Sequence, residues 1–198
     1  MAHVYTDEGV RRCLDAGVRS IEHGNFMSRE TMARLRDAGA FLDPTFISLA
    51  QRVASAAETN LPAAIVDNLR RTIDRGRQVY GWARELGVPI GLGTDLWGAD
   101  AQKSQPREFE QRADLDSPPN ILRSAILVNS DLLMQKGMLG TIITGAYADL
   151  LVVDGNPLSD IRVLAEPERR LKLIMKGGVI YKNSISNAEL GNPQDLRL

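Results

Sequence analysis

The sequence predicts an α/β fold with a parallel sheet, and three observations carry that prediction. Short apolar runs alternate with helical patterns along residues 1–95, which is typical of strands joined by crossover helices. Polar side chains follow the ends of these runs, and beyond residue 137 the pattern changes to short β-like runs around turn residues. We therefore expect an α/β part over residues 1–136, a β module over 137–182 and a polar tail over 183–198.

Two strand-helix units open the chain. Residues 1–4 form the first predicted strand, and Thr6 is placed to cap the helix that follows. Residues 18–21 form the second predicted strand, and Ser28 is placed to cap the second helix.

A long helical stretch separates the third and fourth predicted strands. The third strand, at residues 41–42, is interrupted by Pro44, because proline cannot donate a hydrogen bond within a sheet. The pattern is then helical up to Gly87, with a helix entry at residues 60–62. The apolar run 88–92 predicts a buried fourth strand. Four parallel strands with right-handed crossovers would make half of an eight-stranded barrel.

The remaining elements are shorter. Residues 96–116 are polar and predict a loop around a short helix at 107–112, and Ser117-Pro118 starts another helix. Four β-like runs follow, at residues 139–142, 148–153, 171–175 and 179–181. They predict a small β module after the α/β part.

Composition bears on partners and location. The chain has 198 residues with 24 basic and 25 acidic side chains and no basic stripe or tail, so we expect no nucleic-acid partner. No apolar run approaches the roughly 20 residues that a membrane span requires, so we expect no membrane partner. The single cysteine, Cys13, fits a reducing compartment. We expect a cytoplasmic location, and any signal peptide would lie upstream of Met1.

The two histidines of the chain and Asp95 occupy equivalent places in the predicted units. His3, His23 and Asp95 each fall at the carboxyl end of a predicted strand, where parallel α/β folds collect ligands. Imidazole nitrogen and carboxylate oxygen suit zinc or a similar divalent ion. Such an ion would lower the pKa of a bound water toward ~7, and Asp95 would take its proton as general base. Structural roles stay open: Asp95 as a turn cap, and the histidines as hydrogen-bonded core or surface groups.

Several neighbours of these residues are open to two interpretations. Candidates for a substrate pocket, with packing or capping as the alternative, are Tyr5, Asn25, Thr45 and Trp97. Glu22 precedes His23 and should point to the opposite side of its strand, so we interpret it as a structural carboxylate.

Five stretches, in order, resemble the C-terminal half of the amidohydrolase superfamily. They are AHVYTDEG at 2–9, GVRSIEHG at 17–24, LDPT at 42–45, GLGTD at 91–95 and GAYADLLVVDGNPL at 145–158. The resemblance runs from residue 2 to about 182, and it is nearest to the imidazolonepropionase-like and Xaa-Pro dipeptidase-like enzymes.

The resemblance implies strands 5–8 of a metal-binding (β/α)8 TIM barrel, with the β module as the returning strands of a small β-sandwich. His3 matches the strand-five metal ligand and His23 the strand-six ligand. Asp95 matches the strand-eight aspartate that binds metal and shuttles the proton. Family members hydrolyse amide, cyclic amide or ester-like bonds with a metal-bound hydroxide, using one or two divalent ions, for which we expect zinc.

The chain departs from the family in the ligands it lacks. A strand-one His-x-His pair and, in binuclear branches, a strand-four lysine complete the family's site, and no His-x-His occurs in these residues. We therefore expect a C-terminal fragment whose open barrel edges need a partner, either the missing N-terminal half or a second copy in a homo-oligomer.

Two functions follow as expectations. The first is a metal-dependent hydrolase, or half of one, that acts on a C–N bond of a small molecule or dipeptide; the isolated chain would bind metal weakly and show no hydrolysis. The alternative is a non-catalytic half-barrel that serves in binding or assembly and lacks the complete metal site.

Overall fold

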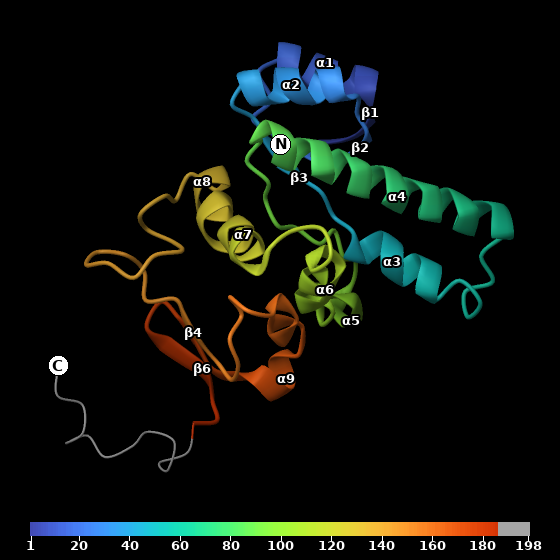
Figure 1. Cartoon of the computed structure of the whole chain (residues 1–198). Helices are drawn as coiled ribbons and strands as arrows, with labels where there is room; N and C mark the ends of the chain where they lie inside the picture. Colours follow the sequence, from blue (N-terminus) through green and yellow to red (C-terminus); the bar gives the residue numbers. More distant parts are fainter. Residues whose placement is uncertain (186–198) are drawn as a thin grey trace, which may run out of the picture.

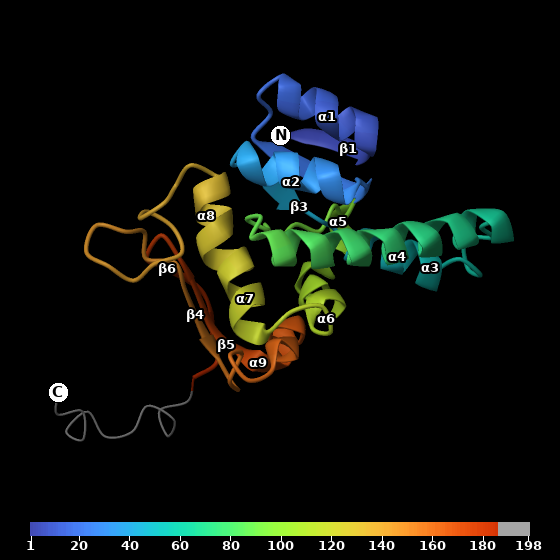
Figure 2. The ribbon, with the colours of Figure 1, turned by 45° about the horizontal axis from the view of Figure 1, so that its top comes forward.

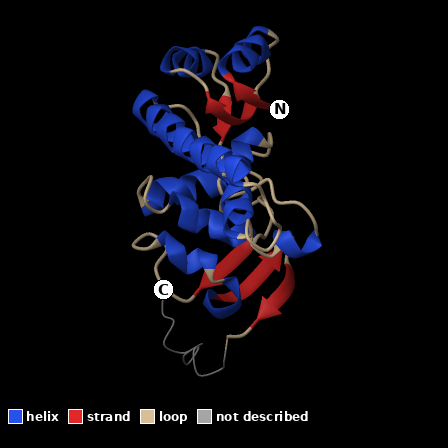
Figure 3. Ribbon diagram, turned by 90° about the vertical axis from the view of Figure 1, so that its right-hand side faces the viewer, coloured by secondary structure: helices blue, strands red, loops and turns tan. Residues whose placement is uncertain are grey.

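The computed structural model describes residues 1–185 and contains two three-stranded sheets at opposite ends of the molecule, with helices between them (Figure 3). The strands are β1 (Ala2–Thr6), β2 (Ser20–Phe26), β3 (Phe41–Asp43), β4 (Leu150–Val153), β5 (Leu171–Lys176) and β6 (Val179–Asn183). The longer helices are α1 (Asp7–Asp15), α2 (Arg29–Asp37), α3 (Ile47–Ala54) and α4 (Ala63–Leu86). The shorter helical segments are α5 (Ala99–Gln102), η1 (Gln105–Arg107), α6 (Glu108–Arg112), α7 (Pro118–Arg123), η2 (Ser124–Val128), α8 (Asn129–Leu132), η3 (Ile161–Ala165) and α9 (Pro167–Arg170).

The first sheet is parallel with the order β1-β2-β3, which confirms the predicted α/β class. Helices α1 and α2 lie together beside it and α4 runs across its end (Figures 1 and 2). Apolar side chains from these elements share one buried core, which includes Val10, Ile21, Met32, Leu35, Leu42, Val79 and Ala83. Parallel sheets are stable when both faces are covered, and this core covers β2.

The helix caps predicted at Thr6 and Ser28 are confirmed, whereas Ser117 stands at the start of α7 without a side-chain cap bond. Thr6 Oγ1 accepts a hydrogen bond from Gly9 N at 3.2 Å, and Ser28 Oγ accepts one from Thr31 N at 3.1 Å. Gly87 closes α4 in the left-handed conformation, with φ of +73°.

The predicted fourth strand at 88–92 is wrong in extent. Only Ile90 forms a parallel bridge, to Leu42, whose N–H donates to the Pro89 carbonyl at 3.0 Å. The ladder stays short because Pro89 has no N–H and because Gly93 N donates to the Asp43 side chain instead of to a backbone carbonyl. The second strand also differs, since β2 begins at Ser20 and runs through His23 to Phe26.

The C-terminal sheet is antiparallel with the order β4-β5-β6, and its hairpin turns at Gly177-Gly178 as predicted. The β-like run at 139–142 is not a strand: Gly140 has a φ of +72° and Ile142 is 85% exposed, with no strand alongside in the described residues. The division at residue 137 stays a prediction. Of the predicted polar tail, residues 186–198 lie outside the described part of the chain. Within residues 1–185, no helix combines the length and apolar character that crossing a bilayer requires.

Candidate functional site

The structure brings His3, His23 and Asp95 together beyond the first sheet. His23 Nε2 lies 2.9 Å from His3 Nδ1 and 3.9 Å from Asp95 Oδ2, and the two imidazole rings meet edge to face with centroids 4.6 Å apart. The register explains part of this meeting, because β1 and β2 are neighbours and residue 95 follows the segment bridged to β3. The metal-binding roles of the three residues stay predictions.

Two of these residues have unusual backbone conformations. His23 has a φ of +74° and Asp95 a φ of +51°, in the left-handed region that few non-glycine residues adopt. Such conformations cost about 1–3 kcal/mol each and cluster at functional sites. His23 pairs with Val4 in the register, one row beyond His3. Its side chain reaches the ring of His3 because the backbone is left-handed at this residue.

His23 is buried and fixed from behind. It is 4% exposed, and its Nδ1 lies 2.8 Å from Thr45 Oγ1, so Nε2 faces His3 and Asp95. Burial lowers the pKa of His23, an effect that the Asp95 charge opposes and His3 reinforces. Tyr5 stacks on the His23 ring with centroids 4.8 Å apart. The imidazole is therefore held neutral and oriented, which is the form that a metal ligand needs.

The four pocket candidates divide into two groups. Tyr5 and Trp97 adjoin the site: burial and then the Asp95 charge raise the pKa of Tyr5, and Trp97 Nε1 donates to Asp95 Oδ1 at 3.1 Å. Thr45 and Asn25 are buried behind it, which favours packing and orientation over substrate contact.

Glu22 lies in the same row of the sheet as His3 and Asp43, and it accepts a hydrogen bond from the Ser20 hydroxyl. Its interpretation as a structural carboxylate stays a prediction.

A buried ionic cluster lies next to the site and escaped the sequence analysis. Arg112 and Glu108 are both 0% exposed and pair through Arg112 Nε and Glu108 Oε1 at 2.8 Å. Arg112 also donates to the carbonyls of Gly91 and Pro44. Burial raises the pKa of Glu108, against the opposing charge of Arg112. The sequence signal was an ordinary Glu-Arg pair four residues apart, which is typical of a solvated helix face.

Asp43 joins this cluster to the segment that precedes Asp95. Its Oδ1 accepts a hydrogen bond from Gly93 N at 2.7 Å and lies 3.7 Å from Arg112 Nη2. Burial raises the pKa of Asp43 to about 7, although the charge of Arg112 opposes the shift.

The donor set suits a divalent ion, whereas the present spacing is that of a hydrogen bond. Two imidazole nitrogens and a carboxylate oxygen are the ligand types that zinc prefers. Tetrahedral zinc holds two nitrogens about 3.4 Å apart, and those of His3 and His23 are 2.9 Å apart. Within residues 1–185 no group of three or more His, Cys, Asp or Glu side chains is arranged to hold a metal ion.

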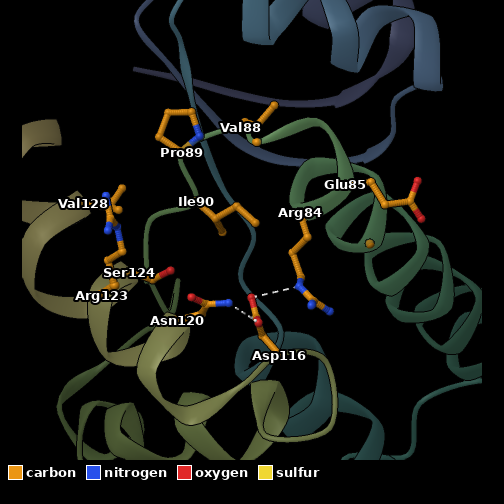
Figure 4. A pocket seen from close by; sticks show the side chains of 12 residues that line it. Arg84, Glu85, Val88, Pro89, Ile90, Asp116, Asn120, Arg123, Ser124 and Val128 are labelled. Carbon is orange, nitrogen blue, oxygen red and sulfur yellow. Dashed lines mark hydrogen bonds and ion pairs between the residues drawn. The ribbon is translucent and has the colours of Figure 1, made fainter.

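A cavity of about 570 Å³ lies away from these residues, at the start of the 88–92 segment (Figure 4). Its central carboxylate, Asp116, is already paired with Arg84 Nε at 3.1 Å and with Asn120 Nδ2 at 2.8 Å. Asp116 is thus satisfied by its neighbours, and we assign the candidate chemistry to the histidine site.

No protein-family model matches the chain, but individual proteins do. Ochratoxinase from Aspergillus niger is 27% identical over 183 residues, which cover 91% of this chain and 37% of the ochratoxinase. A solved amidohydrolase aligns with a TM-score of 0.86 and 34% identity over 93% of this chain and 45% of its own. A prolidase solved with N-methylphosphonate-L-proline aligns with a TM-score of 0.85 and 35% identity over 92% of this chain and 45% of its own.

The chain thus spans less than half the length of each of these proteins. The sequence comparison and the structure comparison both match this chain to amidohydrolases over their C-terminal half, as the five sequence stretches predict. The chain matches the C-terminal half of the amidohydrolase superfamily.

Proposed function

We propose that this chain supplies one half of the active site of a metal-dependent hydrolase that cleaves C–N bonds, with dipeptides as the substrate class. The observation that carries the proposal is the meeting of His3 Nδ1, His23 Nε2 and Asp95 Oδ2 at one edge of the parallel sheet. The likeness to a prolidase solved with N-methylphosphonate-L-proline supports a dipeptide substrate.

Each site residue has a role in this proposal. His3, His23 and Asp95 would be the ligands of the metal centre, for which we expect one or two zinc ions. When bound, such an ion lowers the pKa of water and polarises the carbonyl to be attacked. Asp95, whose side chain is 35% exposed, accepts the proton of the attacking water and gives it to the leaving nitrogen. Thr45 holds the His23 ring in position.

The partner in this proposal is the segment that corresponds to the N-terminal part of the relatives. The sheet β1-β2-β3 and the bridged 88–92 segment would be strands 5–8 of a (β/α)8 barrel, with β4-β5-β6 as part of a sandwich. β1 is an edge strand, and the C-terminal sheet exposes Leu151, Ile180 and Tyr181 by more than half. Open edges and apolar faces of this kind favour a covering partner, with a second copy of the chain as the alternative.

A second function, binding or assembly without catalysis, is favoured by the spacing of the imidazoles. His3 and His23 hydrogen-bond to each other at 2.9 Å, so the pair is satisfied without an ion. In this case the chain keeps the fold and the exposed apolar face but performs no hydrolysis.

One fusion experiment separates the two functions. The N-terminal part of the prolidase relative is joined before residue 1, and proline release from Xaa-Pro dipeptides is measured with Zn²⁺ for the fusion and for the chain alone. We expect turnover by the fusion, none by the chain alone, and a loss of about 100-fold or more in kcat for Asp95→Asn. The matched control is Asp100→Asn, because the Asp100 side chain is 97% exposed and pairs with Lys103.

A folded, Zn²⁺-loaded fusion without hydrolysis would contradict the hydrolase proposal and favour the assembly function. Equal turnover by Asp95→Asn would contradict the proton-transfer role of Asp95.

A further inference from the structure

The side chain of Asn129 makes two hydrogen bonds to one edge of the stretch Gly91-Leu92-Gly93, which lies just before Asp95. Asn129 Nδ2 donates to the Leu92 carbonyl at 3.0 Å, and Asn129 Oδ1 accepts from Leu92 N at 2.9 Å. These are the two hydrogen bonds that a neighbouring strand would make with Leu92. One side chain therefore replaces a strand on this edge.

The side chain of Asp43 accepts a hydrogen bond from the opposite edge of the same stretch. Its Oδ1 accepts from Gly93 N at 2.7 Å, and Gly91 N donates to the Leu42 carbonyl at 2.8 Å on the same edge. Arg112, buried beside them, donates to the Gly91 carbonyl. N–H groups of successive residues in an extended chain point to opposite edges, so Asn129 and Asp43 hold the segment from both sides. We call these two side chains the 91–93 clamp.

The two glycines of this stretch make room for the clamp. A Cβ at Gly93 would lie 2.4 Å from Asp43 Oδ2, and a Cβ at Gly91 would lie 3.1 Å from Asn129 Oδ1. Neither glycine has a positive φ, so close approach of the clamp, not backbone conformation, accounts for glycine at both positions.

Asn129 is presented by an irregular helix. The π-helical turn Ser124–Val128 lies directly before it and shifts its register relative to α7. Turns of this type occur frequently at functional sites, which supports a role beyond packing.

We propose that Asp43 and Asn129 are positioning residues that fix the backbone of residues 91–93 and so set the carboxylate of Asp95 relative to His23. This inference rests on the proposed function, in which Asp95 and His23 share a metal centre. Asp95 follows Gly93 by two residues and adopts a left-handed conformation. The direction of its side chain therefore depends on where Gly93 is held.

The first test measures ¹⁵N relaxation at Thr94 and Asp95 in the full chain, for Asn129→Ala, Asp43→Ala and two comparison variants. Asn120→Ala is the matched control, because Asn120 lies on the same helical run but pairs with Asp116. Asp43→Asn keeps an oxygen that accepts from Gly93 N. We expect order parameters to fall from about 0.85 toward 0.6 in the two clamp variants and to stay high in the control and in Asp43→Asn. Unchanged order at Asp95 in both alanine variants would overturn the inference.

The second test measures the Zn²⁺ dissociation constant of the same proteins. We expect about tenfold weaker binding in Asn129→Ala and Asp43→Ala, and wild-type binding in Asn120→Ala and Asp43→Asn. If an alanine variant does not fold, Gly91→Ala replaces it and should weaken binding in the same direction, since it presses on Asn129 without removing a buried polar group.

The two tests separate this inference from the proposed function. Equal Zn²⁺ binding by the wild type and both clamp variants would overturn the positioning role. A wild type that binds no Zn²⁺, with the relaxation changes as expected, would remove the metal function and support the clamp.

Discussion

The two sheets differ in how far they bury their strands. Five of the seven residues of β2 are buried, whereas no residue of β6 is. β2 has strands on both sides and the main apolar core over it, while β6 leaves Ile180 and Tyr181 more than half exposed. We therefore expect the parallel sheet to contribute more to the free energy of unfolding of the described chain than the antiparallel sheet, which offers a surface for association.

The largest expected difference between the two ends concerns buried and exposed arginines. Arg112→Met leaves Glu108 buried without its partner, so we expect the free energy of unfolding to fall by about 3–5 kcal/mol. The matched control Arg162→Met removes a pair with Asp114, which is 77% exposed, and should cost less than about 1 kcal/mol. Urea unfolding measures both, and equal losses would contradict the contrast between the two ends.

Truncation of one isoleucine in each sheet sharpens the same comparison. Ile21 in β2 is fully buried, so Ile21→Ala should lower the free energy of unfolding by about 3 kcal/mol. Ile180 in β6 is 51% exposed, and Ile180→Ala should change it by about 0.5 kcal/mol. Chemical denaturation of both variants provides the test, and a larger loss at Ile180 would reverse our assignment.

The pH dependence of stability should come from the parallel end. The pKa of Asp43 is raised from 3.8 to about 7, so between these values the folded chain binds more protons at Asp43 than the unfolded chain does. Asp43 therefore lowers the free energy of unfolding as pH rises toward 7, by about 2 kcal/mol between pH 5 and 7. Urea titrations at pH 5, 6 and 7 should show a flatter dependence for Asp43→Asn. An identical slope in this variant would exclude Asp43 as the source.

The smallest expected effect concerns the hydroxyl behind His23. Thr45→Val removes the group 2.8 Å from His23 Nδ1 at nearly constant volume, so Zn²⁺ binding should weaken about tenfold, or about 1.4 kcal/mol. Thr59→Val is the matched control, because Thr59 Oγ1 donates to a backbone carbonyl within an exposed turn. Competition with a chromophoric chelator measures both affinities. Equal affinities for Thr45→Val and the wild type would assign Thr45 to packing alone.

Much of the parallel part could be predicted from local sequence. Thr6 and Ser28 cap their helices because the signal for a cap lies within four residues. His3, His23 and Asp95 could be grouped because parallel strands end at the same edge of a sheet. These are consequences of short-range pattern and of topology.

The parts that escaped prediction depend on contacts distant in sequence. The ladder of the 88–92 segment ends early because the side chain of Asp43, fifty residues away in sequence, accepts the Gly93 N–H. Arg112 can be buried because its guanidinium donates hydrogen bonds to the carbonyls of Pro44 and Gly91, which belong to two other segments. The turn at His23 needs a positive φ, which local sequence favours only weakly for histidine.

The most direct test of the metal centre uses the two histidines, because the chain contains no others. A Zn²⁺ titration of the full chain, followed by NMR of the imidazole groups, reports on His3 and His23 alone. We predict that both rings shift together and that Asp95→Asn abolishes the joint shift while Asp100→Asn preserves it. Rings that stay unchanged at saturating Zn²⁺, or that shift equally in Asp95→Asn, would contradict a centre shared by these three residues.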